Sequence, residues 1–287
     1  MRFGVHIPVG GGLARAGEGA QMIACETVQI FSGNPRGWKN GPVPQPEGRL
    51  FKAALTEAGI HPLVIHAIYL INLASPQADL RAKSIKAFAE LLGRAVALQA
   101  EYVVLHPGSH GGEGPAAGAE LSGSGLREAW EEAGRPEQPV ILLENVAGGG
   151  QLLGASPAEL AAIRAAAGEE LGPRLGLCLD SCHAFAAGYD LREERGWRRL
   201  LDEVGESWGA GAVRVVHAND SAGELGSHRD RHLQPGDGAL GEQGFRAMLS
   251  QPELRELPAI VETPQEETEP PGHNLRLLKN LRDNLAP

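Results

Sequence analysis

The chain has 287 residues, of which 42% are hydrophobic and 22% charged, and its formal net charge is −10. No stretch approaches the ~18 consecutive apolar residues of a membrane span, and the negative charge argues against a protein that coats nucleic acid through its overall field. The first residues, M-R-F-G-V-H-I-P, lack a hydrophobic signal region. Cys25, Cys178 and Cys182 have no disulfide or zinc-motif spacing, so we expect buried thiols in a cytoplasmic protein.

Eight short segments have the composition of β-strands. They are mostly continuously apolar, as is typical of parallel strands that are buried on both faces of a sheet. In chain order the predicted strands are Phe3–Ile7, Val28–Phe31, Leu63–His66, Tyr102–His106, Val140–Glu144, Leu175–Asp180, Val213–His217 and Ala259–Glu262.

Helical segments separate these strands. Ser156-Pro157-Ala158-Glu159 is a capping box that opens a helix to about Ala167. The other predicted helices are Ala78–Gln99, Asp190–Glu206, Gly241–Ser250 and His273–Leu285, and the long Gly/Pro-rich loops after strands are Gly33–Gly48, Pro107–Gly118 and Ala218–Gly238. The alternation of strand and helix predicts one (β/α)₈ TIM-barrel domain over residues 1–287, with its site at the C-terminal face of the strands.

Six consecutive predicted strands each end in a residue that can bind a metal ion. These residues are His66, His106, Glu144, Asp180, His217 and Glu262. The strand ends of a barrel form a ring, so three imidazoles and three carboxylates would converge on one mouth. Carboxylates in a partly dry pocket repel one another and need a counter-charge. We therefore expect divalent cations there.

Three more candidate ligands lie just beyond the strand ends: His183, three residues after Asp180, and the pair Asp230 and His232 in D-R-H. A His, Asp, His set is a normal zinc shell that leaves one position open for water or substrate. Nine ligands suffice for three ions if one carboxylate bridges two of them. Among the strand-end carboxylates Glu144 is the natural bridge, and His6 is expected to support a ligand.

Five segments resemble the endonuclease IV family of apurinic/apyrimidinic (AP) endonucleases, and the resemblance runs over essentially the whole chain. They are Y-L-I-N-L-A-S-P at Tyr69–Pro76, C-L-D-S-C-H-A-F-A-A-G-Y-D at Cys178–Asp190, H-A-N-D-S at His217–Ser221, D-R-H-x-x-x-G-x-G-x-x-G at Asp230–Gly241 and E-T-P at Glu262–Pro264.

The resemblance implies three Zn²⁺ ions per chain on a TIM barrel. The first would be held by residues matching His66, His106 and the bridging Glu144. The second would use Glu144, Asp180, His217 and Glu262, and the third would use His183, Asp230 and His232.

The implied reaction is hydrolysis of the DNA phosphodiester on the 5′ side of an abasic site, which leaves a 3′-hydroxyl and a 5′-deoxyribose phosphate. Zinc suits this chemistry, because it lowers the pKa of bound water to about 7 and so supplies hydroxide at neutral pH. Glu144 and Glu262 are the expected catalytic carboxylates that orient the attacking oxygen. Arg229 and Arg231, which flank Asp230, could contact DNA phosphate.

An abasic site is easier to kink and extrude than intact duplex, so recognition must come from loops. The resemblance implies that Arg36, Tyr69 and Leu70 enter the minor groove of DNA. The chain departs from the family at Gly37, where relatives commonly have glutamine after the arginine; Trp38 or Arg36 could fill the gap instead.

Two other classes of protein share parts of this pattern. A sugar isomerase or epimerase of the xylose-isomerase-like type also carries histidines and carboxylates at strand ends, but does not need the Asp230–His232 pair. A non-catalytic, zinc-stabilised DNA-binding module would not need open metal positions. We expect a protein that acts as a monomer on double-stranded DNA containing abasic sites, without a membrane partner.

Overall fold

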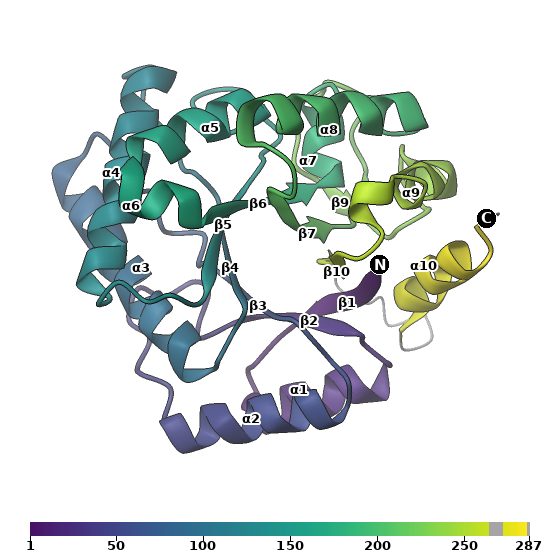
Figure 1. Cartoon of the computed structure of the whole chain (residues 1–287), viewed down its shortest axis with the longest axis horizontal. Coiled ribbons are helices and arrows are strands. Elements are labelled where there is room, and N and C mark those ends of the chain that lie inside the picture. The colour runs from purple at the N-terminus through teal and green to yellow at the C-terminus, as the bar shows by residue number, and fades with distance from the viewer. Residues whose placement is uncertain (264–271, 286–287) are drawn as a thin grey trace.

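The computed structural model describes residues 1–263 and 272–285, and its centre is a closed barrel of eight parallel strands surrounded by helices (Figure 1). The strands follow one another around the barrel in chain order, which confirms the predicted TIM barrel. Their bounds are β1 Arg2–Ile7, β2 Thr27–Phe31, β3 Leu63–His66, β4 Tyr102–Leu105, β5 Val140–Glu144, β6 Leu175–Asp180, β7 Val213–His217 and β10 Pro258–Val261.

The barrel interior is a packed layer rather than a pore. One side chain from each of six strands contributes to it, namely Val64, Val104, Leu142, Cys178, Val215 and Ile260, all of them 0% exposed. Side chains alternate between the two faces of a strand, so the residue two positions further on also points into the barrel. On these six strands that second position is the predicted strand end, and the next inward layer is therefore built of the predicted metal ligands.

Helices cover the outside of the barrel. Their bounds are α1 Leu13–Met22, α2 Gln45–Glu57, α3 Ala78–Ala97, α4 Pro115–Glu132, α5 Pro157–Ala166, α6 Gly168–Leu171, α7 Ser181–Ala186, α8 Glu194–Trp208, α9 Gly241–Leu249 and α10 His273–Asp283. Their apolar faces and the outer faces of the strands form the main core, and all three cysteine thiols are free and buried. None of the helices in the described part of the chain is long and apolar enough to cross a membrane.

All five predicted helices are confirmed, and they differ from the prediction only at their ends. The capping box works on one side as predicted, because Ser156 accepts a hydrogen bond from the Glu159 backbone N–H at 3.3 Å. The start of α8 was predicted four residues too early. Asp190 instead forms a local turn, in which its carboxylate accepts hydrogen bonds from the Arg192 side chain at 2.7 and 2.8 Å.

Two predicted loops end earlier than expected. α2 begins at Gln45 within Gly33–Gly48, and α4 begins at Pro115 within Pro107–Gly118. The prolines that suggested a loop lie in the first turn of each helix, where a missing N–H costs nothing. The third loop contains a short antiparallel strand pair, β8 Asp220–Ser221 with β9 His232–Leu233. Pro264 of the E-T-P segment lies outside the described residues.

Candidate metal centre

The six strand-end residues and the three later candidates meet in three groups at one mouth of the barrel. Within each group the ligand atoms lie within 4.8 Å of one another. His106 and Glu262 each fall one residue beyond the end of their strands, β4 and β10, but still follow the inward alternation. The groups are His66, His106 and Glu144; then Glu144, Asp180, His217 and Glu262; and then His183, Asp230 and His232.

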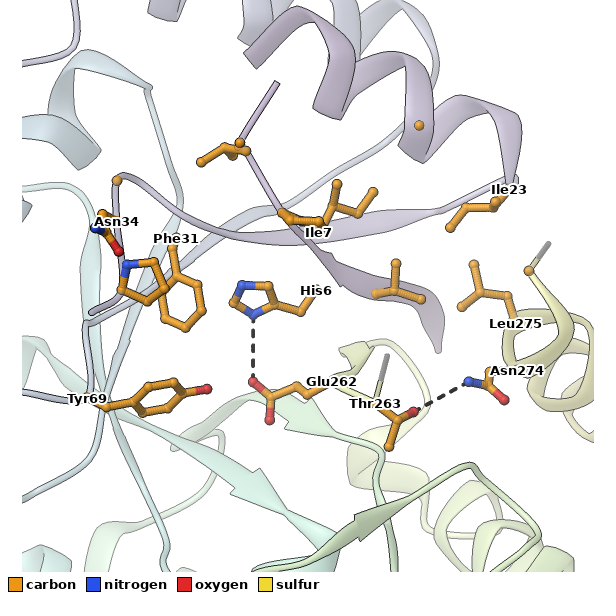
Figure 2. Close-up of a pocket in the computed structure, with 18 of the residues that line it drawn as sticks. His6, Ile7, Ile23, Phe31, Asn34, Tyr69, Glu262, Thr263, Asn274 and Leu275 are labelled. Carbon is orange, nitrogen blue, oxygen red and sulfur yellow. Dashed lines mark hydrogen bonds and ion pairs between the residues drawn. The ribbon is translucent and has the colours of Figure 1, made fainter. Parts of the chain in front are cut away.

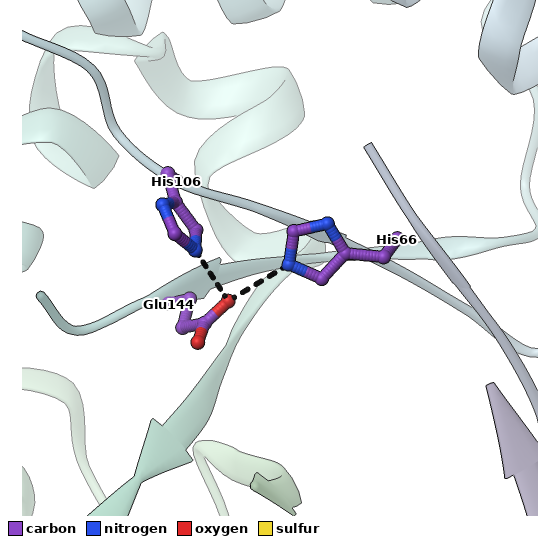
Figure 3. Close-up of side chains that lie close together, drawn as sticks. All are labelled: His66, His106 and Glu144. Atoms are coloured by element: carbon purple, nitrogen blue, oxygen red, sulfur yellow. Dashed lines mark hydrogen bonds and ion pairs between the residues drawn. The ribbon is translucent and has the colours of Figure 1, made fainter. Parts of the chain in front are cut away.

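In the first group, two imidazoles face one carboxylate oxygen (Figure 3). The Nε2 atoms of His66 and His106 lie 3.2 and 3.1 Å from Oε2 of Glu144. Glu144 is fully buried, and its other oxygen, Oε1, faces His217 Nδ1 at 2.9 Å. One carboxylate therefore belongs to two groups, with one oxygen directed at each.

The second group places three carboxylates around one imidazole. Besides Glu144, the Nδ1 atom of His217 faces Glu262 Oε2 at 3.1 Å and Asp180 Oδ2 at 3.9 Å. Glu144 and Asp180 are 0% exposed, so these negative charges are held in a medium that screens them poorly. A positive charge at their centre is what the arrangement requires.

The third group lies nearer to solvent. His183 Nε2 and His232 Nε2 lie 3.2 and 3.1 Å from the two oxygens of Asp230, and 3.4 Å from each other. The Asp230 side chain is 53% exposed, whereas that of His183 is buried. Asp180, Cys182 and His232 form a further candidate group. Asp180 ends β6 and belongs to the second group, and His183 of the third group follows it on α7. The second and third groups are therefore adjacent.

The ionisation of these side chains reflects their crowding. Burial by itself would raise the pKa of Glu144 and of Glu262, but neighbouring histidines, His217 above all, hold both well below their ordinary value. Burial opposes the charged form of His183 and His217, yet Asp180 around the first and Cys178, Glu262 and Glu144 around the second raise their pKa well above the ordinary value. The lowered pKa of the carboxyl groups and the raised pKa of the histidines show that each negative carboxylate is stabilised by positively charged neighbours.

The histidine rings are oriented by hydrogen bonds on their outer sides. Nδ1 of His66 donates to the Ala67 carbonyl at 2.7 Å, and Nδ1 of His183 donates to the Asn145 carbonyl at 2.9 Å. When each ring is neutral, this leaves Nε2, which is directed at the carboxylates, as the unprotonated nitrogen that a metal ion needs. The donor atoms present therefore fit divalent metal ions, with imidazole nitrogen and carboxylate oxygen in each group.

Two amide side chains that the sequence analysis did not single out hold the carboxylates. Asn219 donates to Asp180 Oδ2 at 2.6 Å and to Glu262 Oε2 at 3.1 Å. Gln29 donates to Glu262 Oε1 at 2.7 Å. A signal for Gln29 was available: it is a polar residue inside the apolar run T-V-Q-I-F, in register with His6 on the neighbouring strand. His6 itself accepts from Gln29 at 3.0 Å, consistent with its expected supporting role.

A cavity of about 1090 Å³ opens beside Glu262. Its walls include Ile7, Phe31 and Leu275, and the Tyr69 hydroxyl points toward His6 and Glu262 (Figure 2). Glu262 is the carboxylate of the centre that lines this cavity, with an 11% exposed side chain against 0% for Glu144. A molecule in the cavity would therefore reach the second group through Glu262.

The residues predicted to contact DNA lie in different settings. Arg36 and Tyr69 line the cavity, and the Tyr69 side chain is 65% exposed, with its ring edge-on to Phe31 at 5.4 Å. Partial burial, and next the carboxylates of Glu262 and Glu144, raise the pKa of the Tyr69 hydroxyl to about 12, so it stays a neutral donor. Leu70 is half-buried against the core.

The remaining candidates lie on exposed loops. Arg229 and Arg231 are exposed on either side of Asp230. Trp38 packs against the core with Lys83 4.3 Å above its ring, so of the two residues that could compensate for Gly37, Arg36 is the exposed one.

Comparison with known proteins gives the class and then the family. Residues 19–282 match the family model described as xylose isomerase-like TIM barrel. The chain is 43% identical over 289 residues to a probable endonuclease 4 of Solibacter usitatus, covering 100% of this chain and 99% of the relative. It is 40% identical over 282 residues to a probable endonuclease 4 of Methanosphaerula palustris, covering 98% of both.

Solved structures agree with these relatives. The crystal structure of endonuclease IV from Thermus thermophilus superposes with a TM-score of 0.87 at 37% identity, covering 99% of both chains. A D-tagatose 3-epimerase-like protein superposes with a TM-score of 0.75 at 20% identity, covering 99% of this chain and 98% of that one, a likeness that extends to the fold alone. The molecule is thus a xylose isomerase-like barrel with a cluster of candidate metal-binding side chains at its mouth. Within that class, the chain belongs to the endonuclease IV family.

Proposed function

We propose that this protein is an AP endonuclease of base excision repair, which hydrolyses the DNA phosphodiester 5′ to an abasic site and leaves a 3′-hydroxyl and a 5′-deoxyribose phosphate. The observation that carries the proposal is the meeting of three donor groups at one barrel mouth, two of which share Glu144, in a chain whose full-length relatives are probable endonucleases. Membership of the endonuclease IV family supports DNA as the substrate. We further propose that the protein is specific for abasic sites in DNA.

We propose that the three groups hold three Zn²⁺ ions. Their imidazole nitrogens and carboxylate oxygens are donors that zinc commonly accepts, and the His183, Asp230 and His232 group has the three-ligand composition of catalytic zinc sites. Bound zinc would polarise the phosphate and bring the pKa of water to about 7. All nine side chains come from one chain, which supports a monomer as the active form.

Glu262 and Glu144 have different parts in the proposed mechanism. Glu262 lines the cavity, so its carboxylate is placed to orient the attacking water and accept its proton. Gln29 and Asn219 each donate to one of its oxygens and restrict its orientation. Glu144 is enclosed by histidines and serves to hold the first two groups at a fixed separation.

We propose that residues of the early loops recognise the lesion. Tyr69 projects from the end of β3 above the first group, with its ring centroid 5.6 Å from that of His66 and 6.2 Å from that of His106. Arg36 shares the cavity wall with it. We propose that Tyr69 and Leu70 wedge into the duplex, and that Arg36, Arg229 and Arg231 contact its backbone.

The deciding experiment uses a duplex that carries one abasic analogue. The protein should nick the strand on the 5′ side of the analogue and leave the matched intact duplex uncut. Prolonged chelation should abolish the nick and Zn²⁺ should restore it, with metal analysis giving about three zinc per chain. Binding without a nick would favour a non-catalytic DNA-binding module, and full activity in metal-free protein would exclude the metal mechanism.

A further inference from the structure

The glycine motif that follows Asp230 and His232 is not accounted for by the proposed function. Its glycines are Gly236, Gly238 and Gly241, in a G-x-G-x-x-G spacing that elsewhere surrounds phosphate groups with backbone N–H donors. Here the three N–H groups point inward, at the carboxylate of one residue, Asp220. The motif therefore surrounds an anion that belongs to the protein itself.

Asp220 accepts five backbone hydrogen bonds. Its Oδ2 accepts from Gly236, Gly238 and Gly241 at 3.0, 3.0 and 3.1 Å. Its Oδ1 accepts from Leu240 at 2.9 Å and from Ser221 at 2.8 Å. The side chain is 0% exposed, so these donors replace the water that a buried carboxylate loses.

The glycines are needed for this close approach. A Cβ atom on Gly238 would lie 2.4 Å from Asp220 Oδ1 and 2.5 Å from the Ser221 carbonyl oxygen. Gly236 and Gly241 have φ angles of +98° and +62°, in the region that favours glycine. The spacing of the motif thus matches the shape of the carboxylate it encloses.

The same carboxylate lies on the strand pair that carries His232, a proposed metal ligand. β8 pairs with β9, Ser221 opposite His232, and the Ala222 N–H donates to the Arg231 carbonyl at 2.9 Å. On the other side of the loop, the Ala239 N–H donates to the Ser221 carbonyl at 2.8 Å. Residues 231–241 are therefore attached to β8 at both ends, and the four bonds that their backbone donates to Asp220 close the second end.

We propose that Asp220 is a positioning residue for the third metal group. Its carboxylate accepts hydrogen bonds from the backbone of residues 236–241 and so holds the segment that follows β9. This fixes the position of β9, and with it His232 and, two residues earlier, Asp230, opposite His183. Asp220 acts only through these residues. The inference rests on the proposed function, which assigns a metal ion to this group.

The test replaces Asp220 by asparagine. The amide has nearly the same volume but only one acceptor oxygen, and its NH₂ group would face N–H donors. Zn²⁺ titration against a competing chelator should show one ion bound about 10- to 100-fold more weakly in Asp220→Asn, the usual effect of losing a supporting group. The other ions should keep the wild-type affinity, and hydrogen exchange should speed up at Gly236, Gly238, Leu240 and Gly241.

Three further variants keep the test decisive. Glu26→Gln is the matched control, because the Glu26 carboxylate also accepts a backbone hydrogen bond, from the Phe3 N–H at 2.9 Å near the start of β1. Glu26 is remote from the metal groups in sequence, so this variant should leave the zinc titration unchanged. If Asp220→Asn does not fold, Gly238→Ala displaces the loop from an intact carboxylate and should weaken the same ion. Asp230→Ala identifies that ion, and adding Asp220→Asn to it should have no further effect on zinc binding.

The outcomes separate the inference from the proposed function. Faster exchange of the loop with an unchanged zinc titration would show that Asp220 only stabilises the loop, and would overturn the inference. Equal weakening of all the ions would overturn it as well. If Asp230→Ala and the wild type bind the same number of zinc ions, the assignment of a metal to the third group is wrong, and the proposed function needs revision first.

Discussion

Gln29 accepts a hydrogen bond from His217, with Nε2 of the imidazole 2.9 Å from Oε1 of the amide. The orientation of the amide follows from its other end, which donates to the Glu262 carboxylate at 2.7 Å. His217 must therefore carry a proton on Nε2, and in the neutral ring Nδ1 is left as the lone pair that faces the carboxylates. One residue in strand β2 thus sets both the tautomer of a proposed ligand and the position of a proposed catalytic carboxylate.

Gln29→Leu should weaken metal binding at the second group without unfolding the barrel. The leucine removes the acceptor for His217 and the donor to Glu262, so the ring is free to bind through the wrong nitrogen. We expect a loss of about 10- to 100-fold in zinc affinity. Thr27→Val is the control, since it removes a partly buried hydrogen bond of 2.7 Å at the other end of the same strand. Equal zinc affinity in the two variants would contradict the role of Gln29.

Glu262→Gln should retain the fold and lose most of the turnover. The amide cannot accept a proton from water, and removing a general base costs about 10²–10⁴-fold in rate. The measurement is single-turnover cleavage of an abasic duplex, with zinc content determined on the same samples. Glu253→Gln, which removes a surface carboxylate paired with Arg198, should cleave like the wild type. Near-normal turnover in Glu262→Gln would remove Glu262 from the mechanism.

Tyr69→Ala should weaken binding to abasic DNA and leave zinc content intact. The exposed ring lies 5.6 and 6.2 Å from the rings of His66 and His106, between centroids, and it is not a proposed ligand, so its loss removes no metal ligand. One aromatic contact to a base is worth ~1–3 kcal/mol, or about 5- to 150-fold in affinity. Leu50→Ala removes a comparably exposed apolar side chain on α2 and should not change DNA binding. Unchanged binding in Tyr69→Ala would place the wedge elsewhere.

The metal-free protein should be most stable in mildly acidic solution. The pKa of His183 and of His217 is raised in the folded state, so their stabilisation is complete below the unfolded value of about 6.5 and is lost as pH rises through the folded pKa. The pKa of Glu144 and of Glu262 is lowered, so their stabilisation is complete above the unfolded value of about 4.3 and is lost as pH falls. Both contributions are present between about pH 4.3 and 6.5.

Zinc should reverse the upper part of this profile. Metal binding needs neutral imidazole, so it releases protons and strengthens as pH rises. Thermal unfolding of metal-free and zinc-loaded protein from about pH 5 to 8 checks both statements. We expect the difference in Tm to grow with pH. A metal-free Tm that rises steadily from about pH 6 to 8 would contradict the assigned pKa directions.

The strand ends show how far local rules reach. Because side chains alternate along a strand, an apolar run that stops at a polar residue predicts both the strand and the direction of its last side chain, and this holds for Glu144, Asp180 and His217. The barrel is predicted by the alternation of strand and helix, repeated eight times. Helices α2 and α4 were not predicted, because each has a proline in its first turn. A proline is common both in loops and at the start of a helix, and the sequence alone does not distinguish the two.

The barrel and the ring of ionisable strand ends could be predicted from the residues alone, since both depend on short-range periodicity and on the parallel direction of neighbouring strands. Only the tertiary structure shows which side-chain and backbone atoms come into contact. Gln29 and His217 are 188 residues apart, and the enclosure of Asp220 by Gly236, Gly238 and Gly241 depends on a chain reversal that no spacing specifies. Hydrogen bonds of this kind are set by the closure of the barrel and its loops, which brings distant segments into contact.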